Sequence, residues 1–88
     1  MDINKIAQKF DDLKSSVYKH SYLQMTDNFE IVIDRCNGVL TYDENIIILK
    51  LINNKLNIIG ADMKMQNFST EGVIISGKIH SLEFGEKE

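Results

Sequence analysis

Hydrophobic residues follow two different periods along the chain, and the change falls near residue 21. Before it, apolar residues recur at spacings of three and four, which places them on one stripe of an α-helix: Ile3, Ile6, Ala7, Phe10, Leu13, Val17 and Tyr18. Asp2 is a suitable N-cap, and Lys14 and Lys19 match the negative end of the helix dipole. We therefore predict an amphipathic helix over residues 3–20, which would cover the open apolar side or one end of the remaining fold.

From Tyr22 onward the period changes to two, as in strands that bury one face. About seven short strands are predicted in this way: Phe29–Asp34, Val39–Tyr42, Ile46–Ile52, Leu56–Ile59, Met63–Gln66, Val73–Ser76 and Ile79–Phe84. The third of these segments is apolar on both faces, which predicts the most buried strand.

Residues typical of turns separate these segments. Asn37-Gly38 predicts a hairpin with a type I′ turn, because both central positions of that turn need a positive φ. Asp43-Glu44-Asn45 predicts a polar corner, Asn53-Asn54 a second tight turn, and residues 69–72 a loop. Gly77 leaves three alternatives open, namely a kink, a bulge or part of a turn.

The two periods together predict one domain over residues 1–88, mainly β and α+β at the margin. The helix over 3–20 would precede an antiparallel β-meander over residues 22–84. A sheet of so many strands must twist and curl, so we expect a strongly bent sheet or a small partly closed barrel. Eighty-eight residues are too few for a second core, and the stability margin of so short a domain is thin. Association with a second copy or a partner would stabilise it.

Composition and charge narrow the classes of function. Hydrophobic residues make up 43% of the chain and charged residues 26%, which favours a packed globular domain over disorder. The net charge of −3 argues against wide contact with phosphate backbones or anionic lipid. The lone Cys36 cannot form an internal disulfide, which fits a reducing compartment. The apolar runs are too short to cross a bilayer, and residues 1–16 lack the apolar region of a signal peptide, so we expect no direct membrane insertion.

The sequence offers few candidate residues for metal binding or catalysis. His20 and His80 lie far apart in the sequence and have no further ligand at a suitable spacing, so no metal site is predicted. A nucleophilic Cys36–His80 pair would require Cys36 in an accessible, electropositive place, and a small apolar side chain beside a turn is the favoured interpretation. The acidic pairs Asp11-Asp12 and Asp43-Glu44 belong to the polar side of a helix and to a turn, and such solvated positions do not favour general acid/base catalysis. We predict no catalytic residues, no metal and no cofactor, and hence no enzyme.

Two features are candidate interaction surfaces. The first is the edge of the sheet, because few residues that protect edges are evident and the chain has no proline. The second consists of four side chains: Met63, Met65, Phe68 and His80. Methionine adapts to irregular surfaces, although ordinary core packing is the favoured interpretation of the two methionines. His80 would lie at the surface or on a side that faces a partner.

From about Phe29 to Phe84 the chain resembles the YabP/YqfC sporulation family, and its YqfC branch more closely. The segments that carry the resemblance are EIVID, NGVLTYDENIIILKL, NNKLNIIGADMKMQN and GVIISGKIHSLEF. The resemblance implies a protein of endospore-forming bacteria that acts during spore development in the cytoplasm of the mother cell. Family members are often encoded beside a larger membrane-associated sporulation protein, and no catalytic residues are assigned to the family.

The leading hypothesis is a non-enzymatic sporulation protein that acts through protein–protein contacts. It would be a small self-associating scaffold or an adaptor, with itself and a membrane-associated sporulation protein as partners. In the cytoplasm it could lie peripherally at a membrane through that partner. The alternative is an Sm-like nucleic-acid-binding β-barrel, against which the acidic net charge and the few aromatic residues argue.

Overall fold

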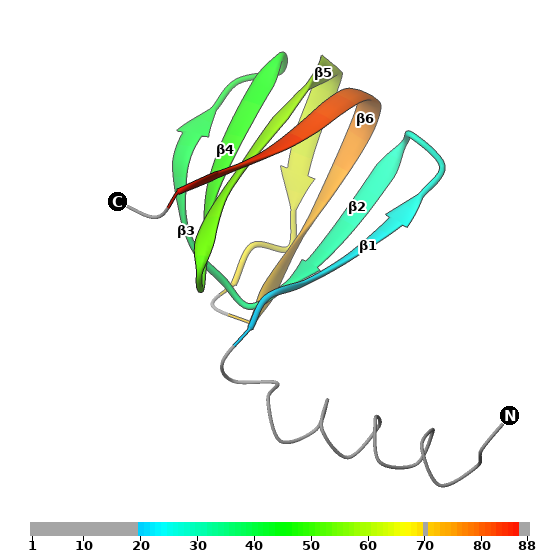
Figure 1. The fold of residues 1–88 in the computed structure, drawn as a ribbon. Coiled ribbons are helices and arrows are strands. Elements are labelled where there is room, and N and C mark those ends of the chain that lie inside the picture. The colour runs from blue at the N-terminus through cyan, green and yellow to red at the C-terminus, as the bar shows by residue number, and fades with distance from the viewer. Residues whose placement is uncertain (1–19, 70, 87–88) are drawn as a thin grey trace, which may run out of the picture.

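The structure is a computed structural model that describes residues 20–69 and 71–86. The predicted helix over residues 3–20 lies outside this part of the chain, apart from His20. Within the described ranges the fold is mainly β, as predicted, and consists of six strands in one antiparallel sheet (Figure 1). The strands are β1 (Tyr22–Thr26), β2 (Glu30–Asp34), β3 (Cys36–Tyr42), β4 (Ile46–Leu51), β5 (Asn54–Gln66) and β6 (Gly72–Glu86).

The strand order is β1-β2-β6-β5-β4-β3, so only part of the sheet is a meander. Strands β3 to β6 lie side by side in chain order, as predicted, but β6 then pairs with β2 instead of ending the sheet. The first strand, β1, was not predicted as a separate strand and forms a hairpin with β2.

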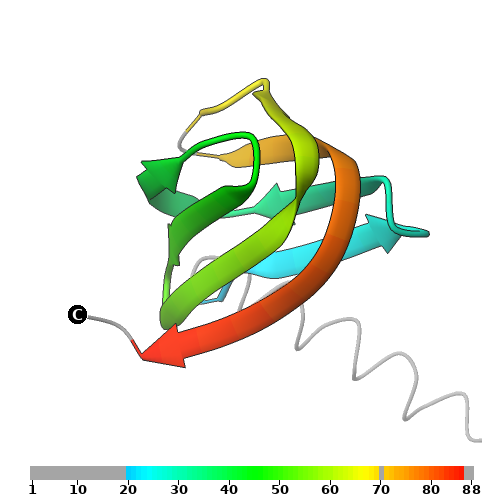
Figure 2. The ribbon, with the colours of Figure 1, turned by 90° about the horizontal axis from the view of Figure 1, so that it is seen from above.

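Strong bending brings the two ends of the sheet together. Strand β2 is the second strand from one side of the sheet, and β3 is the last strand on the other side. Only Arg35 separates them in the sequence, so the end of β2 and the start of β3 lie within about 7 Å of each other. The hydroxyl of Ser21 strengthens this corner, because it donates to Arg35 O at 2.6 Å and accepts from Ile52 N at 3.0 Å. The view along the bend shows the sheet curling around its own interior (Figure 2). Of the two predicted shapes, the strongly bent sheet is confirmed, and the sheet does not close.

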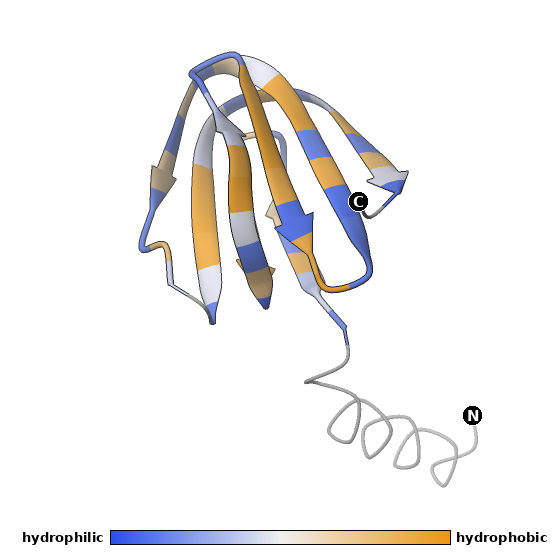
Figure 3. Cartoon of the chain, turned by 90° about the vertical axis from the view of Figure 1, so that its left-hand side faces the viewer, coloured by the Kyte–Doolittle hydropathy of each residue, from blue (hydrophilic) through white to orange (hydrophobic). Residues whose placement is uncertain are grey.

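The inner face of the bend carries the core. Its members alternate with partly exposed residues along the strands, and the hydropathy pattern follows them (Figure 3). They are Ile31, Ile33, Cys36, Ile47, Leu49, Leu51, Leu56, Ile58, Met63, Val73, Ile75 and Ile79. No residue of β4 is exposed, which confirms its prediction as a strand apolar on both faces. Among the described residues no polar side chain is buried, so the interior is apolar throughout.

Two long strands replace four predicted short ones. Leu56–Ile59 and Met63–Gln66 both belong to β5, and the segments on either side of Gly77 both belong to β6. The pairing between β5 and β6 shifts register twice, between Ile59 and Gly60 and between Ala61 and Lys64. Bulges of this kind bend a strand without ending it. The prediction of about seven strands was therefore wrong in number, because β5 continues through residues 60–62 and β6 continues through Gly77, where the strands bend without ending.

The predicted hairpin at Asn37-Gly38 was also wrong. Both residues lie inside β3, where the register shift between Cys36 and Gly38 makes Asn37 a bulged residue. The neighbours of β2 are β1 and β6, so no place remains beside β2 for the strand that follows it. The chain instead turns at Arg35, which has a φ of 67° and donates its N–H to Glu71 O at 2.8 Å.

The other predicted turns lie close to where the sequence placed them. The chain turns between β3 and β4 at residues 43–45, where Asp43 Oδ1 accepts from Asn45 N at 2.7 Å. The tight turn between β4 and β5 falls at Ile52-Asn53, one residue earlier than expected. The last connection runs from residue 67 to residue 71, and its predicted member Thr70 lies outside the described residues.

Candidate functional site

The four predicted interaction residues occupy different environments. Met63 is only 2% exposed and belongs to the core, so its side chain forms no surface. Met65 is partly buried and packs against that core. Phe68 is exposed in the connection after β5, and His80 is exposed at the bulge of β6. Of the four, only Phe68, which is 49% exposed, and His80 are therefore exposed positions.

Several exposed apolar side chains were missed by the sequence analysis. They are Met25, Phe29, Leu40, Tyr42, Ile59 and Phe84. Phe29 continues the alternation of Ile31 and Ile33 along the sequence, yet it lies in the turn between β1 and β2. Leu40 is the additional residue at a register shift of β3, between Val39 and Thr41. Period-two patterns carry no signal for turns or bulges of this kind, because both depend on pairing with distant strands.

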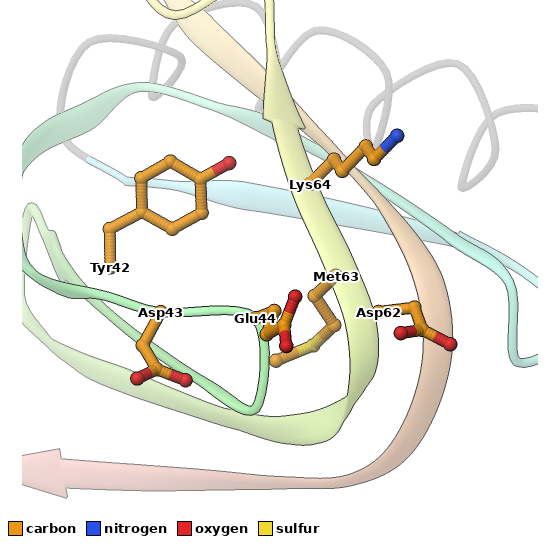
Figure 4. A pocket seen from close by; sticks show the side chains of 6 residues that line it. All are labelled: Tyr42, Asp43, Glu44, Asp62, Met63 and Lys64. Carbon is orange, nitrogen blue, oxygen red and sulfur yellow. The ribbon is translucent and has the colours of Figure 1, made fainter.

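A hollow of about 380 Å³ lies where the end of β3 approaches the second half of β5. It is lined by Tyr42, Asp43, Glu44, Asp62, Met63 and Lys64 (Figure 4). Two hydrogen bonds join its walls, since Met63 N donates to Glu44 O at 3.0 Å and Met65 N donates to the side-chain hydroxyl oxygen of Tyr42 at 3.0 Å. Figure 4 shows the three carboxylates spread around the hollow without converging on one point.

A second hollow, of about 270 Å³, opens at the other end of the core. Leu23 of β1, Leu51 of β4 and Phe84 of β6 line it together with polar residues of the chain entry and the β4–β5 turn. Phe84 is 56% exposed there. The hollow thus joins three apolar side chains at this end of the core to a polar rim, and no Asp, Glu, Lys or Arg is among its lining residues.

The residues considered for nucleophilic or metal chemistry do not meet in a cleft. The Cys36 thiol is buried and points toward the carbonyl oxygens of Gly38 and Lys50, at 3.4 and 3.8 Å. Burial is the main cause that raises the pKa of this thiol above its ordinary value. His20 Nδ1 lies 3.2 Å from Asn53 Nδ2. Across residues 20–69 and 71–86, no three His, Cys, Asp or Glu side chains are grouped to hold a metal ion.

Sheet edges are the remaining candidate surface. Strand β1 ends the sheet on one side and β3 on the other (Figure 1). Neither YLQMT nor CNGVLTY contains a charged residue or a proline. The part of the chain that the structure describes also holds no helix of the length and apolar character needed to span a membrane.

Comparison with known proteins gives one family. The model of the YabP family matches residues 18–88, which covers all six strands. Searches of the curated proteins and of the solved structures give no match. The closer resemblance to the YqfC branch stays a prediction. The extent of the family match, over most of the chain, shows that this protein belongs to the YabP family, and that membership suggests a sporulation-related role.

Proposed function

We propose that the protein is a non-enzymatic sporulation protein that acts through protein–protein contacts. It serves as a small self-associating scaffold or as an adaptor for a membrane-associated sporulation partner. The observation that carries the proposal is a sheet with two uncharged edge strands. Exposed strand edges present unpaired N–H and C=O groups that another chain can complete.

The apolar surface supports the same proposal. Seven large hydrophobic side chains are exposed among the described residues, and several of them lie beside the edges, such as Met25 on β1 and both Leu40 and Tyr42 on β3. Exposed apolar residues that gather along an edge typically mark an interaction site. In contrast, the apolar core holds no buried polar or charged side chain in the described ranges. Contacts with a partner would therefore be made by the exposed side chains at the surface.

As an adaptor, the protein would lie in the cytoplasm of the mother cell. It would be held at a membrane only through its membrane-associated partner. Support comes from the family membership and from the net charge of −3, which disfavours direct binding to anionic lipid. A domain of 88 residues also buries a limited fraction of its surface alone, so contacts with other chains add stability that the core does not provide.

Copies with two different tags, expressed together in sporulating cells, test both parts of the proposal. We expect capture of one tag to retain the second tag and a membrane-associated sporulation protein, identified by mass spectrometry after mild detergent extraction. An unrelated tagged β-domain of similar size and charge is the control. Recovery of neither the second tag nor such a protein above this control would contradict the proposal.

A further inference from the structure

The sheet offers four stretches of strand edge with no strand beside them in the described residues, and they differ in charge and regularity. In the second half of β5, the Met63 and Met65 N–H groups already donate to Glu44 O and to the Tyr42 hydroxyl oxygen. The second half of β6 pairs only with β5 and carries Glu83 and Glu86, which would bring like charges together between two copies. Strand β3 is uncharged, but its ladder with β4 is interrupted by two register shifts. Bulges twist an edge away from partners and protect it.

The edge of β1 lacks these protections. Its five residues pair with β2 from Tyr22↔Asp34 to Thr26↔Glu30 without any register shift. None of the five is charged and none is proline. A short, regular and uncharged edge can accept another strand without like-charge repulsion or loss of ladder geometry. Strand β1 is therefore the edge best suited to pairing.

The positions of the β1 side chains indicate what kind of strand fits. Leu23 and Met25 stand opposite Ile33 and Ile31, both of which belong to the core, so they share the inner face of the sheet. Leu23 is partly buried against the core, whereas Met25 is still 43% exposed. The inner apolar layer thus reaches the edge of the sheet and is incomplete there. A strand that continues this layer needs apolar residues at alternate positions.

A second copy of β1 meets this need. In an antiparallel pair around a two-fold axis perpendicular to the sheet, opposite residues lie on the same face. Full overlap of Tyr22–Thr26 then places Gln24 opposite Gln24, and Leu23 opposite Met25. The apolar residues of both copies meet on the inner face, and the polar Gln24 side chains meet on the outer one. No charged residue of β1 faces another.

We propose that two copies of this protein pair antiparallel through the outer edges of β1, with Gln24 at the two-fold axis. The pair forms one continuous sheet across both copies and extends the apolar layer through Leu23 and Met25. This inference rests on the self-association that we propose as part of the function, and it names the surface that carries it.

Disulfide trapping tests the register directly. Opposite residues of an antiparallel pair have Cα atoms about 4.5–5.5 Å apart, which is within the range that a disulfide bridges. Gln24 is exposed, so oxidation of a Gln24→Cys variant of the full chain is expected to give a covalent dimer that is separated on a non-reducing gel. The matched control is Thr41→Cys, an exposed position on the uncharged edge strand at the other end of the sheet. Wild type controls for the buried Cys36.

Lysine at the same edge gives an independent measurement by light scattering over a range of concentrations. Met25→Lys would place two positive charges in the shared apolar layer, and we expect the dimer dissociation constant to rise at least about tenfold. Leu40→Lys is the matched control, because Leu40 is similarly exposed on β3 and should leave the constant unchanged. Circular dichroism spectra that match wild type establish that both variants are folded.

The outcomes separate the inference from the proposed function. Covalent Gln24→Cys dimers together with weakened association of Met25→Lys support pairing through β1. Wild-type self-association without Gln24→Cys dimers, or with trapping only at Thr41→Cys, overturns the β1 pairing and leaves self-association through another surface. A wild-type monomer at every concentration overturns both the β1 pairing and the self-association on which it rests. If Met25→Lys does not fold, the trapping result alone decides.

Discussion

At the scale of residues, a few unusual backbone conformations determine where the sheet bends. Arg35 and Asp62 adopt positive φ values of 67° and 52°, one at the corner between β2 and β3 and the other at the bulge of β5. Gly77 faces that bulge from β6 and has a φ of 139°. Residues other than glycine rarely adopt such conformations, so Arg35 and Asp62 store strain that the surrounding pairing must offset, whereas Gly77 has no Cβ and adopts its φ without that cost.

Gly77 gives a sharp test of this bend. A Cβ atom at this position would lie 2.7 Å from Asp62 O and 2.8 Å from Met63 Cα, both of which are backbone atoms that cannot move aside cheaply. We expect Gly77→Ala to lower the free energy of unfolding by about 2 kcal/mol or more, from the clash and the positive φ together. Gly85→Ala is the control, because its Cβ would meet only flexible atoms of Lys55 at 3.5 Å or more. Equal unfolding midpoints of the two variants in urea would contradict the described bend.

The buried thiol of Cys36 gives a second prediction at this scale. Because burial raises its pKa above the ordinary 9.0, the folded chain holds the thiol proton at pH values where the unfolded chain loses it. The contribution of this group to stability is therefore constant below pH 9.0 and falls as the pH rises above it. At pH 8 we expect iodoacetamide to alkylate Cys36 much more slowly in the native protein than in urea, as measured by mass spectrometry. Similar rates in both conditions would show that the thiol is accessible.

At the scale of elements, the sequence predicts where strands lie better than how they connect. The alternation of Ile31 and Ile33 and the continuous apolar segment of β4 depend only on local burial, and both strands form as expected. The Asn37-Gly38 signal fails because β6 occupies the place beside β2, a pairing between segments about 40 residues apart in the sequence. Gly77 was ambiguous for the same reason, since a bend and a chain reversal look alike until the partner strand is known.

Of the candidate site, the sequence identified Phe68 and His80 as surface positions and missed the edge of β1. Residues 22–26 have a weak alternation, because Met25 and Thr26 are exposed at the end of the sheet and β1 buries little. Whether a strand lies at the edge of the sheet depends on the order of the strands. The hydrophobic pattern of a single segment does not reveal that order. The Met63 and Met65 side chains face the core, in agreement with the interpretation of the pair as ordinary core.

Strand β6 provides the test at this scale. Residues 74–76 of its first half lie between β2 and β5, whereas residues 82–84 have a strand on one side only. Amide hydrogen exchange by NMR should be at least about tenfold slower for residues 74–76 than for residues 82–84, because buried central ladders open less often. Equal protection along the strand would contradict the pairing of β2 with β6, or would show that another strand covers residues 82–84.

At the scale of the whole molecule, hydrophobic side chains fill the interior of the bent sheet. The polar and charged side chains of the described residues lie toward the surface. Two of the hollows lie at opposite ends of the core: the lining of one includes three acidic residues and Lys64, and that of the other includes Phe84 and several uncharged polar residues. The uncharged strands β1 and β3 end the sheet. Membership in the YabP family suggests a sporulation-related setting for these surfaces. Contacts between chains are the function that this arrangement favours.

The molar mass of the purified full chain in solution tests that claim most directly. Size-exclusion chromatography with light scattering, from about one to a few hundred micromolar, distinguishes one chain from two. We predict a mass that rises with concentration from the 10.1 kDa of one chain to at least twice that value. A mass of 10.1 kDa at every concentration would contradict self-association as the basis of the protein's function.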